Sequence, residues 1–168
     1  MCGKTTLWER STRVPLIFAG PGIENGVCRE PVELLDIYPT LAELAGLAPP
    51  NNVEGISLSP QLANPTARSR PAITIHNPGN CSIGDARYRY IQYADGSQEL
   101  YDLLNDPNEF TNLADQTHMA ATLENLRSFA PKQYAPLAPG SAARILERKG
   151  DQWYWENTLI DPDNRPTD

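Results

Sequence analysis

The chain has 168 residues, enough for one domain with a sizeable core. It is acidic, with a net charge of −7, and 40% of its residues are hydrophobic. An acidic chain without a basic stripe argues against nucleic acid as the main partner, and no apolar run approaches the ~18 residues that a membrane-spanning helix needs.

The first residues contain Gly3-Lys4-Thr5, which is also the end of a nucleotide-binding P-loop pattern. That pattern requires another glycine five residues before Gly3, at the end of a strand, and only Met1 and Cys2 stand there. The tripeptide alone therefore does not indicate a nucleotide site. The lysine remains a candidate ligand for another anion.

The next segments predict a strand, a turn and a helix. Residues 14–19 form a short apolar run closed by Gly-Pro-Gly at residues 20–22, which is typical of a buried strand entering a sharp turn. Apolar side chains at helical spacing then predict a helix that begins near Asp36 and ends at Gly46. Pro39 is compatible with the first turn of this helix, and the carboxylate of Asp36 is a candidate cap. Residues 48–71 read as surface loop.

The following region predicts an antiparallel meander. Strand-forming residues occupy 72–76, 87–94 and 98–103, and Asp95-Gly96 is a strong hairpin signal. Arg87 and Arg89 alternate with tyrosines, and we expect them on a solvated face of the sheet. Cys2, Cys28 and Cys81 are widely spaced and do not suggest a zinc site.

The last part predicts one more helix and a tail. Residues 116–129 carry an apolar stripe, and Pro131 ends the helix. The stripe predicts that this helix covers one face of the meander. Prolines are frequent from residue 131 onward, which indicates an extended tail. The order of elements predicts the last unit of a larger α/β sheet, followed by a small α+β subdomain made of an antiparallel sheet with one packed helix.

Six phrases are spread in order over most of the chain. They are GKTTLWE at residues 3–9, TRVPLI at 12–17, GPG at 20–22, VELLDIYPTL at 32–41, ELYDL at 99–103 and DPNEFTNLA at 106–114. Together they resemble the C-terminal portion of a sulfatase, a member of the alkaline-phosphatase-like superfamily, and most closely the bacterial iduronate-2-sulfatase-like enzymes. The resemblance implies that residues 1–60 end an alkaline-phosphatase-like α/β core, that 61–130 form the α+β subdomain, and that 131–168 are a Pro-rich tail packed on the core.

The resemblance implies a role for Lys4. In sulfatases the lysine just before the Trp-Glu or Tyr-Glu phrase binds the sulfate group. An ammonium offers three donors and a positive charge to oxygens that become more negative as the S–O bond breaks. Lys4 is therefore the expected catalytic, sulfate-binding residue.

The other catalytic parts are not found in this sequence. The sulfatase nucleophile is a formylglycine made within a C-x-P-S-R-type or S-x-P-x-R-type motif, and none of the three cysteines begins such a motif. The family's calcium is held by acidic residues near its N-terminus and by a pair just upstream of the lysine, so no metal ligand is assigned here. We therefore expect a C-terminal fragment that is inactive by itself and has the N-terminal sulfatase portion as its partner.

Two further residues are candidate substrate contacts. His76 and Asn80 lie in a stretch that is near the pocket mouth in related sulfatases, where a polar loop can hydrogen-bond sugar hydroxyls. Many relatives have a histidine where Cys81 stands, so the match is incomplete. Glu9 and Arg13 are expected to form a pair that supports the segment carrying Lys4.

The leading hypothesis is a sulfuric ester hydrolase acting on sulfated carbohydrate. One alternative is a phosphatase or phosphodiesterase of the same superfamily, which the two histidines of the chain do not favour. Another is a noncatalytic module that binds sulfated glycans, which the net negative charge opposes. The family implies a periplasmic or secreted protein, although the first residues lack the apolar stretch of a signal peptide. No membrane or nucleic-acid partner is expected.

Overall fold

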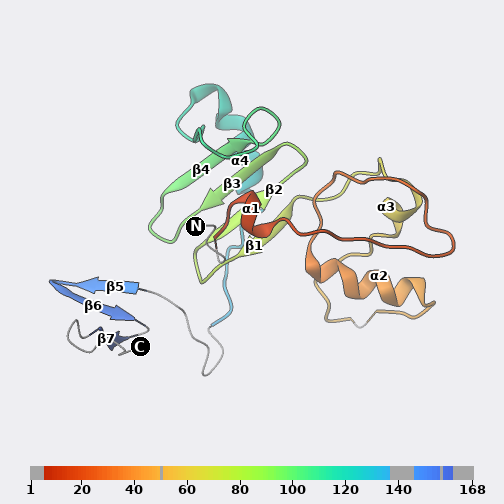
Figure 1. The fold of residues 1–168 in the computed structure, drawn as a ribbon, viewed down its shortest axis with the longest axis horizontal. Helices are drawn as coiled ribbons and strands as arrows, with labels where there is room; N and C mark the ends of the chain where they lie inside the picture. Colours follow the sequence, from red (N-terminus) through yellow and green to blue (C-terminus); the bar gives the residue numbers. More distant parts are fainter. Residues whose placement is uncertain (1–5, 50, 137–145, 156, 161–168) are drawn as a thin grey trace, which may run out of the picture. The chain divides into compact units, whose positions relative to one another are not determined.

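The computed structural model describes residues 6–49, 51–136, 146–155 and 157–160. The chain divides into two compact units, Met1–Tyr134 and Ala135–Asp168, and each contains an antiparallel sheet (Figure 1). Within the described ranges, no helix has the length and apolar character needed to cross a membrane.

The first unit begins with a short helix instead of a strand. α1 spans Glu9–Thr12, and the chain then runs without regular structure to the turn at residues 20–22. The prediction of a strand at residues 14–19 was therefore wrong. Val14 is 57% and Ile17 85% exposed, and neither described sheet includes this segment. A strand needs a hydrogen-bonded neighbour, and favourable residue types do not replace one.

The second helix begins one residue after the predicted start. A 3-10 turn, η1, spans Leu34–Asp36, and α2 follows at Ile37–Leu44, with Pro39 in its first turn as expected. The carboxylate of Asp36 does not cap α2, which corrects the prediction. It instead accepts a hydrogen bond from the backbone N–H of Glu33 at 2.9 Å and so closes the preceding 3-10 turn.

The predicted end of α2 is confirmed. Gly46 has a left-handed φ of 71°, its N–H donates to the carbonyl of Glu43 at 2.9 Å, and the N–H of Leu47 donates to that of Ala42 at 2.8 Å. These two bonds define a Schellman motif, in which glycine adopts the left-handed conformation without steric cost. The loop expected over residues 48–71 contains a short additional helix, α3, at Ser59–Ala63.

A four-stranded antiparallel meander follows, in the order β1-β2-β3-β4. Its strands are β1 (Ala72–Ile75), β2 (Cys81–Gly84), β3 (Tyr88–Gln92) and β4 (Gln98–Asp102). The three predicted strands are confirmed, and so is the hairpin turn, where Gly96 has φ of 88°. β2 was not predicted, because its four residues include Ser82 and Gly84, which are weak strand formers.

One face of this sheet packs against the C-terminal helix of the unit. α4 spans Ala120–Arg127 after a 3-10 turn, η2, at Thr117–Met119. The buried core between helix and sheet contains Cys81, Ile83, Tyr90, Leu100, Met119 and Leu126. The predicted covering helix is thus confirmed, except that Phe129 lies beyond its end and is 41% exposed.

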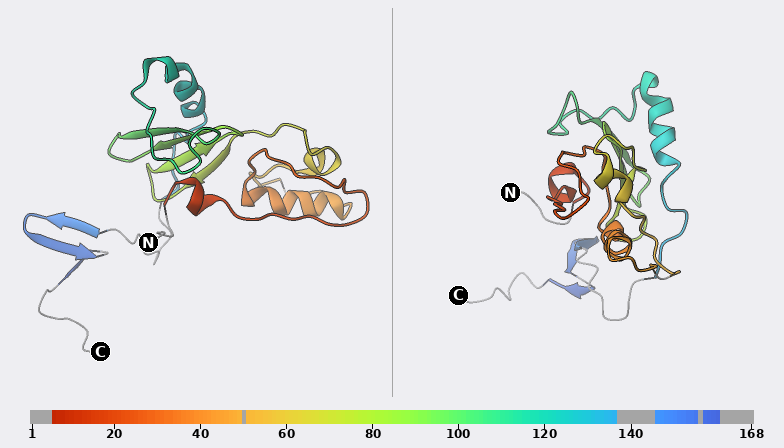
Figure 2. Two further views of the ribbon diagram at one scale, coloured as in Figure 1. Left: turned by 45° about the horizontal axis from the view of Figure 1, so that its top comes forward. Right: turned by 90° about the vertical axis from the view of Figure 1, so that its right-hand side faces the viewer.

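The other face is covered by the N-terminal segment. Leu7, Ile91 and Tyr101 form a second buried cluster there. In the right-hand view of Figure 2 the sheet lies between α1 on one side and α4 on the other. The sheet is therefore buried on both faces, although only one covering element was predicted.

This second layer changes the environment of Arg89. We expected a solvated side chain, and that prediction was wrong, since Arg89 is only 8% exposed. Its guanidinium Nη1 donates to the carbonyl of Leu7 and to Ser82 Oγ, each at 3.1 Å. Arg87 precedes β3 and remains half-exposed, with its guanidinium 4.7 Å from the centre of the Tyr88 ring.

Arg87 holds a buried carboxylate at the end of β4. Its Nε donates to Asp102 Oδ1 at 3.1 Å and its Nη2 to Asp102 Oδ2 at 2.7 Å. These bonds are the main reason why the pKa of Asp102 lies below its ordinary value, and burial acts in the opposite direction. The ionised form of Asp102 is thus favoured in the folded state.

Asp102→Asn is expected to lower the free energy of unfolding by about 1–2 kcal/mol at pH 7, since it weakens charge-assisted hydrogen bonds. Because the pKa of Asp102 is lowered by folding, its contribution is complete above the pKa of the unfolded state and is lost as the pH falls through the folded-state pKa. Urea unfolding at neutral and acidic pH measures this, with exposed Asp115→Asn as the control. A difference that persists unchanged in acid contradicts the assignment.

The second unit is a small antiparallel sheet in the order β5-β6-β7. Its strands are β5 (Leu146–Lys149), β6 (Gln152–Trp155) and β7 (Thr158–Leu159). Gly150, with φ of 66°, lies in the turn between β5 and β6. We predicted only an extended tail in this region, and these three strands were not anticipated from the sequence.

Candidate functional site

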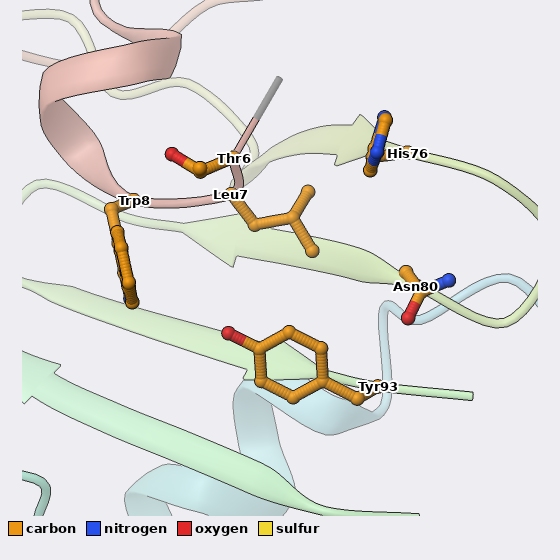
Figure 3. A pocket seen from close by; sticks show the side chains of 6 residues that line it. All are labelled: Thr6, Leu7, Trp8, His76, Asn80 and Tyr93. Carbon is orange, nitrogen blue, oxygen red and sulfur yellow. The ribbon is translucent and has the colours of Figure 1, made fainter. Parts of the chain in front are cut away.

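Lys4, the expected sulfate ligand, lies outside the described residues. The described chain begins at Thr6, and Thr6, Leu7 and Trp8 form one wall of a cavity of about 270 Å³. The rest of the cavity is lined by His76, Asn80 and Tyr93 (Figure 3). The structure therefore brings both candidate substrate contacts next to the segment that leads to Lys4.

The sheet positions the second wall. His76 directly follows β1, Asn80 directly precedes β2, and Tyr93 directly follows β3. Because β1, β2 and β3 are antiparallel neighbours, these three positions lie at the same end of the sheet. Cys81 comes next along the chain but is fully buried in the core on the α4 side, since successive residues of a strand face opposite sides. Its side chain does not line the cavity, and burial raises the pKa of its thiol.

The tight turn between β1 and β2 fixes Asn80. The N–H of His76 donates to the carbonyl of Asn80 at 3.0 Å, and Asn80 Oδ1 accepts from the N–H of Ala94 at 3.1 Å. Gly79 has φ of 86°, and a Cβ atom there would lie 2.8 Å from that of Ala94. Any other residue at position 79 would strain the turn. Both candidate side chains remain partly exposed.

The aromatic residues of the cavity meet at Glu99. Trp8 Nε1 donates to Glu99 Oε2 at 2.9 Å, and the indole is 43% exposed. Burial, followed by the charge of Glu99, raises the pKa of Tyr93 to about 12. Tyr93 therefore keeps its phenolic proton at neutral pH, and its interaction with Glu99 favours this protonated form.

The side chains that line this cavity are mostly polar or aromatic. Its lining supplies a phenol, an imidazole, a carboxamide, the Thr6 hydroxyl and an indole face, which suit hydroxyl groups and ring faces. The Thr6 hydroxyl is hydrogen-bonded to that of Ser11 at 2.5 Å. Across the described part of the chain, no group of three or more His, Cys, Asp or Glu side chains is arranged to hold a metal ion. Calcium is therefore placed on no described residue.

His76 and Asn80, the two predicted substrate contacts, line this cavity together with Trp8 and Tyr93, to which no role was assigned from the sequence. Trp8 belongs to one of the six phrases, so its adjacency to Lys4 was an available signal. Tyr93 lies before the hairpin turn and has the composition of an ordinary strand residue. The expected pair of Glu9 and Arg13 is present at 3.7 Å, but Arg13 is 76% exposed, so the pair contributes little to stability.

The sequence is similar to that of known sulfatases. Residues 1–133 match the family model described as N-sulphoglucosamine sulphohydrolase, C-terminal. A sulfatase of Formosa agariphila is 41% identical over 134 residues, covering 79% of this chain and 26% of the relative. A delta 4,5-hexuronate-2-O-sulfatase of Bacteroides thetaiotaomicron is 38% identical over 126 residues, covering 65% and 26%. The chain thus spans about a quarter of the length of the curated relatives that it matches.

Solved structures agree with this placement. A 2-O GAG sulfatase is 30% identical with a TM-score of 0.58, covering 75% of this chain and 30% of that one. A phosphonate monoester hydrolase of Silicibacter pomeroyi is 28% identical with a TM-score of 0.61, covering 75% and 29%. The predicted resemblance and fold class are confirmed. The chain belongs to the sulfatase family and corresponds to its C-terminal region.

Proposed function

We propose that the complete protein is a sulfuric ester hydrolase that cleaves sulfate esters of sulfated carbohydrate. In this proposal the chain supplies Lys4 and one wall of the substrate pocket. The observation that carries it is the cavity in which residues 6–8 meet His76 and Asn80. Support comes from the family match and from relatives whose names specify a hexuronate-2-O-sulfatase and a 2-O GAG sulfatase.

Each part of the cavity has a chemical use in this proposal. Lys4 binds the sulfate oxygens through its ammonium group. His76 and Asn80 hydrogen-bond sugar hydroxyls, and the exposed indole face of Trp8 packs against the ring. The cavity of about 270 Å³ is slightly below the ~300–1,000 Å³ usual for ligand pockets, as expected if the rest of the protein completes the site.

The remainder of the site belongs to the N-terminal sulfatase portion in this proposal. That portion supplies the formylglycine and the calcium ligands, so the isolated chain is expected to be inactive. The first unit has an apolar surface suited to pack against it, formed by exposed residues before and along α2. These residues are Val14, Leu16, Ile17, Leu34, Leu35, Tyr38, Leu41, Leu44 and Leu47. Large apolar side chains exposed in successive segments of the chain favour a contact with another part of the protein.

The family also suggests that the complete protein acts in the periplasm or outside the cell. Sulfated polysaccharides are extracellular polymers, so an enzyme acting on them is expected where they occur. Fractionation of cells that produce the complete protein tests this location.

The test of the function is an ester-hydrolysis assay on the complete protein. Sulfate release from an aryl sulfate and from 2-O-sulfated uronate disaccharides is compared with the hydrolysis of matched phosphate and phosphonate esters. The phosphonate arm is included because one solved structure of similar fold is a phosphonate monoester hydrolase. A clear preference for phosphate or phosphonate esters contradicts the proposal and favours the superfamily alternative.

A noncatalytic glycan-binding module is the other alternative. It predicts that the isolated chain binds sulfated oligosaccharide and releases it in salt. The net charge of −7 opposes this outcome, because a polyanion is attracted mainly by a basic surface.

His76→Ala in the complete enzyme is expected to raise KM for the sulfated disaccharide by about tenfold, the equivalent of one lost hydrogen bond. The kcat for a small aryl sulfate is expected to change little, because that substrate does not reach the sugar-binding wall. Steady-state kinetics on both substrates measure the effect. The matched control is His118→Ala, since His118 is the only other histidine of the chain and is exposed in η2. Equal effects of both variants contradict the assignment.

A further inference from the structure

A buried group of charges links the N-terminal segment to the sheet. Arg89 on β3 donates through Nη2 to Glu9 Oε2, and its Nε lies 3.7 Å from Glu109 Oε1. The side chains of Arg89 and Glu109 are 10% and 4% exposed, and that of Glu9 is 22% exposed. Three charges from residues 80 and 100 positions apart in the sequence therefore meet beneath the cavity wall.

The same group fixes the backbone of the cavity wall. Arg89 Nη1 donates to the carbonyl of Leu7 at 3.1 Å, and Glu109 Oε2 accepts from the N–H of Glu9 at 2.9 Å. Leu7 lines the cavity, as do its neighbours Thr6 and Trp8. The two bonds thus fix the backbone at Leu7 and at Glu9, on either side of Trp8.

The loop that carries Glu109 contacts α1 at a second point. Asn108 Oδ1 accepts a hydrogen bond from Arg10 Nη2. Glu109 itself has a left-handed φ of 58°, a conformation that costs energy for a residue with a Cβ atom. The surrounding loop maintains it through bonds from the N–H of Glu109 and of Thr111 to Asp106, at 3.1 and 2.8 Å. Glu109, the residue with this unfavourable conformation, is also the one whose carboxylate bonds the N–H of Glu9.

Not every polar atom of these three side chains has a hydrogen-bond partner. Among the described residues, Arg89 Nε and Glu109 Oε1 have no hydrogen-bond partner. Burial raises the pKa of Glu109, while the hydrogen bond from the N–H of Glu9 and, after it, the charge of Arg89 act in the opposite direction.

We infer that Arg89, Glu9 and Glu109 form a clamp that positions the cavity wall and, through it, the approach of Lys4 to the substrate. Lys4 is three residues before Leu7, and a chain spans at most ~3.3–3.6 Å per residue. Fixing Leu7 therefore limits where the ammonium group can reach. Arg89 is a positioning residue and touches no reacting atom. The part that concerns Lys4 rests on the proposed function.

The test measures both segment mobility and kinetics in the complete protein. Glu9→Gln is the mildest variant, because Glu9 is partly exposed and the change keeps its shape. Arg89→Met removes the clamp, and Arg89→Lys keeps the charge without the guanidinium fork. Arg87→Met is the matched control, since it removes an arginine from the same region that faces Asp102 instead.

Amide hydrogen exchange is the readout that does not depend on activity. In Glu9→Gln and Arg89→Met we expect exchange of peptides covering residues 6–12 to become roughly tenfold faster, with β2, β3 and β4 unchanged. In the same variants kcat is expected to fall by about 10- to 100-fold, as for a misplaced catalytic group, with partial recovery in Arg89→Lys. Arg87→Met is expected to leave both readouts unchanged.

Two results overturn the clamp. Unchanged exchange at residues 6–12 in Glu9→Gln and Arg89→Met shows that the charges do not hold the segment. Faster exchange with intact kcat and KM shows that holding it does not matter for the site. If the complete protein instead lacks sulfatase activity, the proposed function fails, while the exchange experiment still decides whether the clamp holds the cavity wall.

Discussion

Lys4→Ala in the complete enzyme is expected to lower kcat for sulfate release by about 10²–10³-fold, the loss measured when one donor to a developing oxyanion is removed from an enzyme. In the proposed reaction, negative charge develops on the oxygen atoms around sulfur, including that of the leaving group, as the S–O bond breaks. A preorganised ammonium in a site that excludes water stabilises that charge more strongly than water does. The interaction therefore increases from the ground state to the transition state.

This origin determines which kinetic constant changes. An interaction that is stronger in the transition state lowers kcat and kcat/KM together, whereas uniform binding raises KM alone. Steady-state kinetics with an aryl sulfate separate the two cases. Lys4→Arg keeps the charge but changes its geometry, so an intermediate rate is expected. Lys132→Ala is the control, since Lys132 is an exposed lysine. Full activity in Lys4→Ala would falsify the catalytic assignment.

Local sequence signals were sufficient for the elements that local interactions determine. The end of α2 at Gly46 and the hairpin at Gly96 follow from the left-handed conformation that glycine adopts without steric cost, and both glycines have it. The apolar stripe over residues 116–129 was predicted from its spacing, and two of its residues, Met119 in η2 and Leu126 in α4, pack in the core against the sheet. The strand at residues 14–19 was predicted wrongly because its composition suits a strand but the structure gives it no strand neighbour.

The environment of Arg89 shows what spacing alone could not supply. Alternation in β3 correctly put Arg89 and Tyr90 on opposite faces, and we assumed that the face with arginine was solvated. Leu7 covers that face from 82 positions away in the sequence. Nothing in the local pattern of β3 encodes this contact. The phrase at residues 106–114 was recognised by resemblance, but its contact with α1 through Glu109 is visible only in three dimensions.

The candidate site likewise combines residues that are close in the sequence with residues brought together only by the fold. His76 and Asn80 were predicted together because they lie in one short stretch that resembles the pocket mouth of related sulfatases. In the cavity they lie next to Thr6 and Trp8, which are about 70 positions earlier in the sequence. Local sequence patterns carry no information about contacts over such a separation. Trp8 and Tyr93 were missed because aromatic residues are ordinary in cores and strands.

Asp36 is the side chain on which the α2 region of the first unit most depends. It is 1% exposed, and its carboxylate accepts from the N–H of Glu33 and of Ile56, each at 2.9 Å. It also accepts from Arg70 Nη2 at 3.0 Å, which bonds Glu33 at 2.7 Å as well. The hydrogen bond that the guanidinium of Arg70 donates to the carboxylate of Glu33 is the largest cause of the raised pKa of Arg70. One carboxylate thus joins α2, the loop after it and the approach to β1.

Asp36→Ala is expected to lower the free energy of unfolding by about 3–5 kcal/mol, because removing one partner leaves the other groups of a buried ionic network unpaired. Asp36→Asn keeps the shape and one acceptor oxygen, so a smaller loss is expected. Urea unfolding of the complete protein measures both. The matched control is Glu43→Ala, an exposed carboxylate on the same helix, with an expected change within about 0.5 kcal/mol.

The comparison of these variants also separates two roles for Asp36. If the carboxylate only capped a helix, Asp36→Ala would lose about 1 kcal/mol and Asp36→Asn almost nothing, since asparagine caps as well as aspartate. A loss of about 3–5 kcal/mol in Asp36→Ala, with a measurable loss in Asp36→Asn as well, is expected only if the buried N–H groups of Glu33 and Ile56 and the guanidinium of Arg70 require the ionised carboxylate. Because Ile56 lies in the loop after α2, that loop is expected to loosen first. Faster amide exchange at residues 51–58 in Asp36→Ala therefore follows from the same contacts, and unchanged exchange there contradicts the role of Asp36 as a link.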